Sequence, residues 1–299
     1  MFIVKHKKIF ISISIALVVL SLISLFTFGL NIGIDFKGGA LTEVAYTDVR
    51  PAQEEVYKNV ETLNLGSVLI QPTGEKSYLV KSRDLNDVEH TSLLKTLSLN
   101  NKDPLTEVSF TSIGPSVGKE LTRKAIIAII LVSLAIICFI AFAFRKVSKP
   151  VSSWRYGLIA IVSLLHDVLI PVGIFVVLSH YYGAEVDTLF LVAILTVLGL
   201  SVSDTIVIFD RIRENLRNDS SHKINFSEIV GRSLEQSYVR SISTSLTVIL
   251  VLLALVFFGP ASTKYFALML TAGMFFGTYS SIFLASPLLV WVAEKQLQK

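Results

Sequence analysis

The sequence predicts a polytopic α-helical membrane protein with six transmembrane helices and one small α+β, ferredoxin-like domain outside the membrane. Of its 299 residues, 52% are hydrophobic, and the mean hydropathy is +0.65. The apolar residues form six long runs, and a helix of ~20 residues crosses a hydrocarbon core of roughly 30 Å. A polar stretch, residues 31–124, separates the first two runs. This composition excludes a soluble globular protein, and the basic residues gather at the ends of the apolar runs, which argues against nucleic acid as a partner.

The six apolar runs are the candidate membrane spans. In chain order they cover residues 9–30, 125–144, 157–179, 187–209, 241–258 and 265–292. The first run follows a basic start, as a signal peptide does, but its core is too long and no A-x-A-like cleavage site follows it. We therefore expect an uncleaved anchor. Cys138, the only cysteine, lies within the second run and is expected to be a small membrane-facing or packing residue.

Lysine and arginine gather in alternate loops, and this pattern predicts the orientation of the chain. Loop 180–186 carries no lysine or arginine, and loop 259–264 carries only Lys264. The basic residues of the two other loops are Arg145, Lys146, Lys149, Arg155, Arg211, Arg213, Arg217, Lys223, Arg232 and Arg240. Because basic loops stay on the cytoplasmic side, both termini are predicted to be cytoplasmic. The expected domains are 1–30, with the N-terminus and first span; 31–124, outside; 125–292, with spans two to six; and 293–299, a cytoplasmic tail.

The outer segment alternates between strand and helix patterns. Its predicted elements are a strand at 40–47, a helix at 51–65, strands at 67–72 and 77–82, a helix at 85–99 and a strand at 105–113. The order β-α-β-β-α-β is that of a ferredoxin-like domain.

Helical spacing predicts which side chains of the outer segment face its core. In the first helix Val56, Val60 and Leu63 share one face. In the second, Val88, Leu93 and either Leu94 or Leu97 are expected to point inward. His90, the only histidine of this segment, is expected to face solvent, and no catalytic constellation is evident.

Asp204 lies inside an apolar span, where a carboxylate costs roughly 2.5–3.5 kcal/mol on insertion scales. Ser201 and Thr205 are spaced from it so that the three side chains share one helix face, and both hydroxyls could donate to the carboxylate. Asn or Ser would serve a purely structural role at lower cost, so we favour a proton-handling role for Asp204 over a static buried pair. Arg240 opens the fifth span and is expected to reach inward toward a carboxylate of the fourth.

His166 and Asp167 form a second polar pair near the middle of the third span. Pro171 follows, and a proline frees a backbone carbonyl and can kink the helix, which leaves room for water or side chains. The residues fit two readings equally well: a polar relay, or a hydrogen-bonded clamp between helices.

Glycines mark two further places. The segment NIGIDFKGG leaves the first span, and Gly33, Asp35, Gly38 and Gly39 suit either a tight return of the backbone or an ordinary turn into the outer segment. In the sixth span, G-M-F-F-G at 273–277 predicts close helix packing at Gly273 and Gly277.

Motifs for enzymatic chemistry are missing from the sequence. GPSVGKE at 114–120 is one residue short of a phosphate-binding loop, and Glu120 stands where a serine or threonine should hold magnesium. H-E-x-x-H, C-x-x-C and G-x-S-x-G do not occur. We therefore expect no enzyme, no ATPase activity, no cofactor and no bound metal.

Four motifs together resemble the SecF family, the smaller subunit of the bacterial SecD–SecF complex. They are GIDFKGG at 33–39, LLHDVLI at 164–170, GLSVSDTIVIFDRIREN at 199–215 and LEQSYVRSISTS at 234–245. With six spans and one outer domain after the first, the likeness covers essentially the whole chain.

The resemblance implies half of an RND-type transporter in the bacterial inner membrane, completed by SecD. It further implies association with the SecYEG channel, YajC and YidC, indirect cooperation with SecA, and late export of preproteins driven by the proton-motive force. Asp204 matches the family's proton-pathway aspartate and Arg240 its functional arginine. The outer domain matches the one that moves against emerging substrate.

Two other functions fit the residues. One is an RND-type exporter half for small molecules or lipids, although such exporters usually carry both halves and two large outer domains in one chain. The other is a passive scaffold for membrane subunits. Sodium could replace the proton as coupling ion, because the carboxylate and hydroxyl oxygens of Asp204, Ser201 and Thr205 suit either ion.

Overall fold

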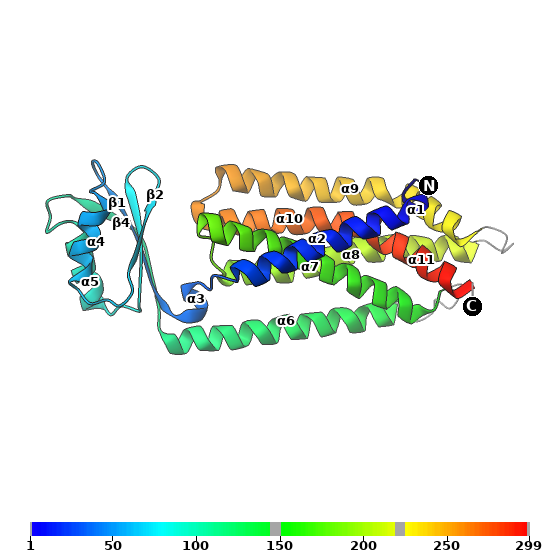
Figure 1. Ribbon diagram of the computed structural model, residues 1–299, viewed down its shortest axis with the longest axis horizontal. Helices are drawn as coiled ribbons and strands as arrows, with labels where there is room; N and C mark the ends of the chain where they lie inside the picture. Colours follow the sequence, from blue (N-terminus) through cyan, green and yellow to red (C-terminus); the bar gives the residue numbers. More distant parts are fainter. Residues whose placement is uncertain (1, 144–150, 219–224, 298–299) are drawn as a thin grey trace. The chain divides into compact units, whose positions relative to one another are not determined.

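The computed structural model describes residues 2–143, 151–218 and 225–297. The basic residues Arg145, Lys146, Lys149 and Lys223, which entered the orientation argument, lie outside the described residues. The chain divides into two compact units (Figure 1). One unit combines residues 1–31 and 128–299, and the other comprises residues 32–127.

Six candidate membrane spans are found among the described residues, as the sequence predicts. They are α2 (Lys7–Phe28), α6 (Pro115–Ala143), α7 (Ser153–Tyr182), α8 (Thr188–Asn218), α9 (Phe226–Phe258) and the pair α10 (Lys264–Ser280) with α11 (Ser286–Leu297), joined by the π-helical turn η2 (Ser281–Ala285). Two short helices, α1 (Phe2–Lys5) and η1 (Ala261–Thr263), precede α2 and α10. The helices α8 and α9 extend well beyond the predicted spans because hydropathy marks only the apolar part of a helix.

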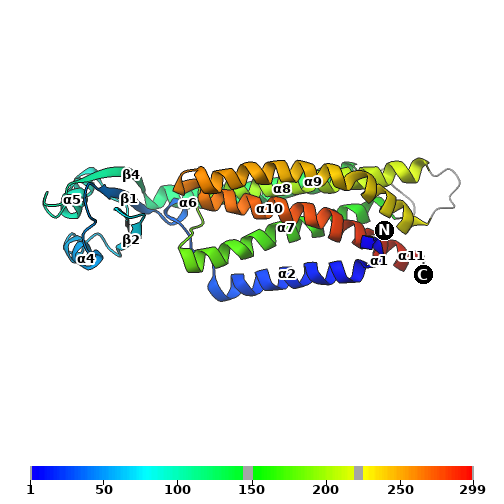
Figure 2. The ribbon, with the colours of Figure 1, turned by 90° about the horizontal axis from the view of Figure 1, so that it is seen from above.

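The helical unit is built around α7, α8 and α10 (Figures 1 and 2). In their apolar stretches 44–61% of the residues are buried, against 11% in α2, α6 and α9. The helix α2 packs on α7, where the Oγ of Ser24 donates to the carbonyl oxygen of Gly173 at 2.9 Å. The helices α2, α6 and α9 therefore leave broad apolar faces for lipid or for another protein.

Glycines let α10 approach α8 closely. A Cβ atom at Gly273 would lie 2.1 Å from Cγ2 of Val197, and one at Gly277 would lie 3.2 Å from Cβ of Ser201. Both glycines sit on the face of α10 that touches α8, one helical turn apart.

Gly273→Ala is expected to destabilise the helical unit, because the added methyl group displaces Val197 and overpacking costs about 1–3 kcal/mol. The measurement is the unfolding temperature of the purified chain in detergent. Gly199→Ala on α8 is the matched control, since no atom lies within 4 Å of a Cβ at that position. Equal unfolding temperatures for the two variants would contradict the packing argument.

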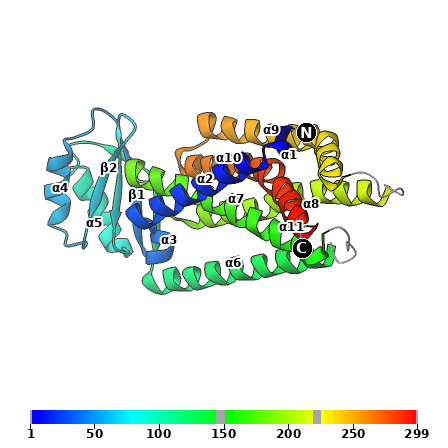
Figure 3. The ribbon, with the colours of Figure 1, turned by 45° about the vertical axis from the view of Figure 1, so that its right-hand side comes forward.

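The second unit, residues 32–127, has the predicted ferredoxin-like order, and we call it the outer unit after its predicted location. Its elements are α3 (Ile34–Lys37), β1 (Gly39–Tyr46), α4 (Gln53–Glu61), β2 (Leu69–Thr73), β3 (Ser77–Ser82), α5 (Asp87–Leu97) and β4 (Leu105–Ile113). The strands form an antiparallel sheet in the order β2-β3-β1-β4. Figure 3 shows α4 and α5 beside this sheet. The core between sheet and helices includes Val56, Val60, Leu93 and Leu97, all predicted to point inward, with Leu63 and Leu94 packed against it.

Two expectations for α5 were wrong. Val88 is 76% exposed rather than inward, because it lies about 140° around the helix from Leu93. His90 does not face solvent: its ring stacks on Phe110 of β4 with centroids 3.7 Å apart, and its Nε2 lies 3.2 Å from Oε1 of Glu107. His90 precedes Leu93 by one turn, so α5 turns its ring toward the sheet.

The start of α5 is held by side chains. Asn86 accepts a hydrogen bond from the backbone N–H of Glu89, and the Glu89 carboxylate accepts one from the backbone N–H of Asn86. Glu89 also pairs with Arg83. The hydrogen bond from Arg83, followed by that from Asn86, lowers the pKa of Glu89 to about 2. These contacts satisfy N–H groups that a helix start otherwise leaves open.

Candidate functional site

Polar side chains gather at the centre of the helical unit, between helices that are otherwise apolar. We call this group the central polar cluster. Its members, contributed by α7, α8, α9, α10 and η2, are His166, Asp167, Ser201, Asp204, Thr205, Ser245, Thr278, Ser280 and Ser281. Polar groups at membrane depth are costly and mark candidate functional sites.

Asp167 is the most deeply buried carboxylate of the cluster, with no exposed surface. Its Oδ1 lies 2.8 Å from Nδ1 of His166, and its Oδ2 accepts hydrogen bonds from the hydroxyls of Ser201 and, at 2.6 Å, Ser280. The donors belong to α7, α8 and α10. One carboxylate therefore ties three helices together, with hydrogen bonds that offset the cost of its burial.

Asp204 lies at the edge of the cluster and is half-buried. Its Oδ2 accepts hydrogen bonds from Thr278 at 3.1 Å and from Ser245 at 3.4 Å, and these two hydroxyls also bond to each other. The carboxylate thus contacts α9 and α10 on one side and keeps part of its surface accessible. This arrangement suits a group that exchanges a proton with its surroundings.

The expected partners of Asp204 are bonded elsewhere. Ser201 donates to Asp167, and Thr205 hydrogen-bonds the hydroxyl of Ser281 at 2.9 Å and approaches the Ser201 carbonyl oxygen at 3.4 Å. Spacing along α8 puts these hydroxyls near the face of Asp204, but the neighbouring helices determine which carboxylate each one reaches.

Sequence patterns did not predict Ser245, Thr278 and Ser280 as partners of the two carboxylates. For Thr278 and Ser280, the signal that could have found them is the concentration of hydroxyls next to the glycines of the sixth span. The π-helical turn begins at Ser281, and such turns occur frequently at functional sites.

Arg240 lies on the exposed side of α9. Its guanidinium does not take part in any ion pair between residues that the structure describes, so the expected inward reach toward a carboxylate of α8 is not observed in this single chain. The buried face of α9 instead carries Ser233, Ser237, Ser241 and Ser245. Arg240 precedes Ser241 and faces away from the bundle.

Segment 33–39, which includes α3 and leads into β1, packs on the first turns of α6 within the outer unit. We call this segment the glycine-rich loop. Gly38 and Gly39 have φ angles of +80° and +142°, which other residues rarely adopt. A Cβ at Gly118 would lie 2.8 Å from the backbone nitrogen of Gly38, and the hydroxyl of Thr122 donates to the Phe36 carbonyl oxygen at 3.2 Å. Segment 114–120 therefore starts a helix that holds this loop; Gly33 and Asp35 lie on the same loop.

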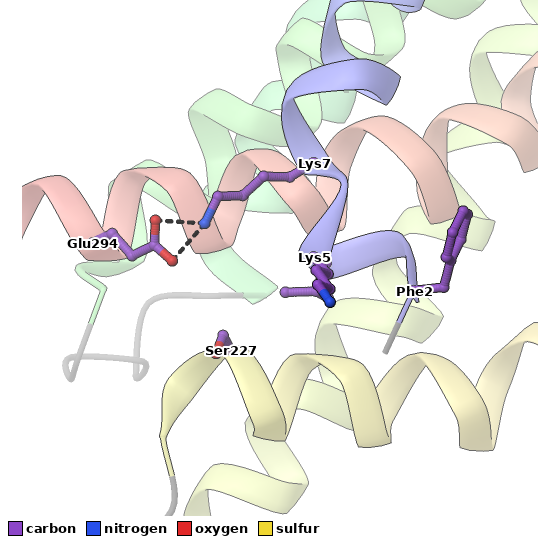
Figure 4. A pocket seen from close by; sticks show the side chains of 6 residues that line it. Phe2, Lys5, Lys7, Ser227 and Glu294 are labelled. Atoms are coloured by element: carbon purple, nitrogen blue, oxygen red, sulfur yellow. Dashed lines mark hydrogen bonds and ion pairs between the residues drawn. The ribbon is translucent and has the colours of Figure 1, made fainter.

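A cavity of about 500 Å³ lies at the N-terminal end of α2, apart from the central polar cluster (Figure 4). It is lined by Phe2, Val4, Lys5, Lys7, Ser227 and Glu294. Nζ of Lys7 lies 2.5 Å from both carboxylate oxygens of Glu294, an ion pair that joins α2 to α11. Within the described ranges, no group of three or more histidine, cysteine, aspartate or glutamate side chains could hold a metal ion.

The chemistry available to the central polar cluster is proton transfer. It combines two carboxylates, one imidazole and several hydroxyls in an apolar surround. Asp167 and Asp204 belong to the same cluster, and two carboxylates that share an apolar site resist being charged together. Uptake of a proton by one of them therefore affects the charge state of the other.

Two family models match the chain. One, described as "Protein export membrane protein SecD/SecF, C-terminal", matches residues 93–295, and the other, the "SecD/SecF GG Motif", matches residues 23–48. Among curated proteins, the protein translocase subunit SecF of Thermobaculum terrenum is 43% identical, with 96% of this chain and 92% of that protein covered. SecF of Anaerolinea thermophila is 38% identical, with 95% and 92% covered.

Two longer proteins that match this chain are named SecDF. The protein translocase subunit SecDF of Bacillus subtilis is 34% identical over 97% of this chain and 37% of its own length. The crystal structure of a Thermus SecDF, described as a translocon-associated membrane protein, matches with a TM-score of 0.79 at 30% identity. The match covers 98% of this chain and 38% of that one.

Proposed function

This chain belongs to the SecF family of protein translocase subunits, and we propose that it uses the proton-motive force, together with a SecD partner, to promote late protein export across the bacterial inner membrane. It is a multi-pass membrane protein and an accessory subunit of the Sec translocase. The finer parts of the proposal are the coupling ion, the stage of export and the roles of Asp204 and Arg240.

The observation that carries the coupling is the pair of carboxylates in the central polar cluster. Moving one elementary charge across the membrane potential yields about 2.3 kcal/mol per 100 mV, which is enough to shift a helix arrangement that depends on a few hydrogen bonds. Asp204 holds Ser245 on α9 and Thr278 on α10. Its protonation replaces a charged acceptor by a neutral one and so weakens the links between α8 and these two helices.

A SecD partner is supported by the SecDF relatives, which span about 2.7 times the length matched here, since the match covers 37–38% of them. Arg240 lies on an exposed face of α9 within a chain whose α2, α6 and α9 are little buried. We assign this face to the SecD side, so that Arg240 meets a carboxylate across the subunit boundary. SecYEG, YajC, YidC, SecA and the translocating preprotein are the further partners of the proposal.

The orientation follows from the charge pattern of the loops. Both termini and the segments 145–156 and 210–240 face the cytoplasm, and the outer unit faces the opposite side, where exported protein emerges. In this scheme, the proton cycle in the spans changes the position of the outer unit against the preprotein.

Complementation tests the function. Cells depleted of their own SecF receive this chain or an empty vector, together with a matching SecD, and unprocessed preprotein is followed by pulse-chase. We expect preprotein to be cleared faster with the chain than with the vector. A different result would instead identify an exporter half. In that case preprotein accumulates equally with the chain and with the vector, while the chain restores efflux of an apolar compound.

A further inference from the structure

His166 has one ring nitrogen that the central polar cluster does not use. Its side chain is 2% exposed, its Nδ1 bonds Asp167, and its Nε2 has no hydrogen-bond partner. Buried polar groups in folded proteins nearly always have a partner, so this nitrogen needs an explanation.

Three other buried hydroxyls without a partner come from the elements around His166. Ser163 lies one turn earlier on α7, and Tyr279 of α10 stacks its ring on the imidazole with centroids 6.2 Å apart. Ser14 is the third and belongs to α2. Each such group left alone costs about 1–3 kcal/mol.

The packing of α2 on α7 places Ser14 at the level of His166. The two helices run in the same direction, and Ser21 of α2 lies against Gly173 of α7. Seven residues earlier, or about two turns, stand Ser14 on one helix and His166 on the other. Ser14 on α2 therefore stands near the level of His166, one turn from Ser163 on α7 and beside the helix on which the Tyr279 ring stacks. An ordered water among these groups would have the two to four partners that buried water needs.

We propose that His166 and Asp167 form a second proton-binding site, distinct from Asp204, which we call the station. It is protonated, or loaded, from a water held between Ser14, Ser163 and Tyr279. This second site rests on the proposed function only in that it gives the proposed proton cycle a second place where a proton binds. In the loading step, a proton that reaches this water as hydronium binds Nε2 and leaves a neutral water behind, while the Nδ1 proton passes to Oδ1 of Asp167. The imidazole ends neutral in its other tautomer, and the reverse step returns the proton along the same route.

Loading has a structural consequence. The neutral carboxyl of Asp167 is a weaker acceptor than the carboxylate, so the hydrogen bonds from Ser201 on α8 and Ser280 on α10 weaken. Charge and packing are coupled at the point where three helices meet.

The other titratable groups around the station are few. Tyr279 of α10 stacks on the imidazole, and Asp204 of α8 lies in the same polar cluster, where it contacts Ser245 and Thr278. The helix α2 contributes Ser14, and its lysines, Lys7 and Lys8, stand at its start. On α11, Glu294 pairs with Lys7, and Lys295 stacks over Trp291. No charged residue occurs in η2, whose sequence is SIFLA. A proton at His166 is therefore shared chiefly with Asp167.

Infrared difference spectroscopy tests the station on the full chain assembled with SecD in nanodiscs. In an Asp204→Asn background, we expect a step in pH to reveal a protonated-carboxyl band that disappears when Asp167→Asn is added. Transfer to heavy water should shift this band, because water reaches the station. The station is overturned if adding Asp167→Asn removes no band. Export plays no part in this readout, so a failed complementation leaves it unaffected.

The route is tested by the rate of that shift. His166→Gln keeps a donor for Asp167 but cannot relay, and Ser14→Val removes a hydroxyl and fills the water site. Each is expected to slow deuteration of the Asp167 carboxyl by about tenfold, which corresponds to about 1.4 kcal/mol in barrier. Ser12→Val, on the exposed side of α2, is the matched control. Unchanged rates in both variants overturn the route.

A second measurement keeps the station falsifiable if the double variant does not fold. Isotope-labelled histidine in the otherwise unaltered chain reports the tautomer of His166 by NMR, with the signal assigned by its loss in His166→Gln. A change from Nδ1–H to Nε2–H as the pH falls supports the station. One tautomer throughout contradicts it.

Discussion

Asp204→Asn is expected to leave the chain assembled in the membrane and to abolish its stimulation of protein export. The amide has the shape of the carboxylate, and its oxygen can still accept from Ser245 and Thr278. It cannot take up and release a proton, so the coupling step is lost while the packing stays. The measurement is the clearance of preprotein by pulse-chase in cells depleted of their own SecF, with the amount of chain in the membrane as reference.

A matched control is Asp210→Asn, which removes a carboxylate from the same helix, six residues later. Asp210 is exposed and pairs with Arg213 at 2.6 Å, and an exposed pair contributes little to stability or to a buried proton path. We expect this variant to clear preprotein normally. Full stimulation by Asp204→Asn would remove Asp204 from the coupling step and favour a passive scaffold.

Gly118→Val is expected to unfold the junction between the glycine-rich loop and α6, at a cost of about 3 kcal/mol. The first atoms that a new Cβ meets are the backbone nitrogen of Gly38, at 2.8 Å, and the carbonyl oxygen of Phe36, at 3.1 Å. Backbone atoms cannot rotate away as a side chain can. Gly38 is itself confined by its φ of +80° and by the nearby backbone of Pro115, so the loop has no direction in which to move.

Limited trypsin digestion of the membrane-embedded chain measures this effect, since Lys37, the last residue of α3, is exposed and its peptide bond becomes cleavable when the backbone of α3 unfolds. Gly114→Val is the control, because nothing lies within 4 Å of a Cβ at that position. We expect rapid cleavage after Lys37 in Gly118→Val and none beyond the unaltered level in Gly114→Val. The same rate in both would show that the glycine is not needed for close approach.

The candidate site could be predicted in part. Charged residues inside apolar runs stand out because they are costly there, which pointed to Asp204 and to His166 with Asp167. What the sequence did not predict is the position of Asp167, which is fully buried and joins three helices. Its partner Ser280 is an ordinary small residue by its sequence context, and only the meeting of α7, α8 and α10 gives it a role.

By itself the sequence determined the six spans, the ferredoxin-like order of the outer unit and the placement of two aspartates within apolar helices, because hydropathy and periodicity are properties of a single element. The tertiary structure decided which hydroxyl meets which carboxylate, that His90 stacks on Phe110, and that Arg240 stays on an exposed face. These contacts depend on how neighbouring elements cross and how closely glycines let them approach. A rotation of one helix by a single residue, about 100°, would exchange all of its partners without changing the pattern along the chain.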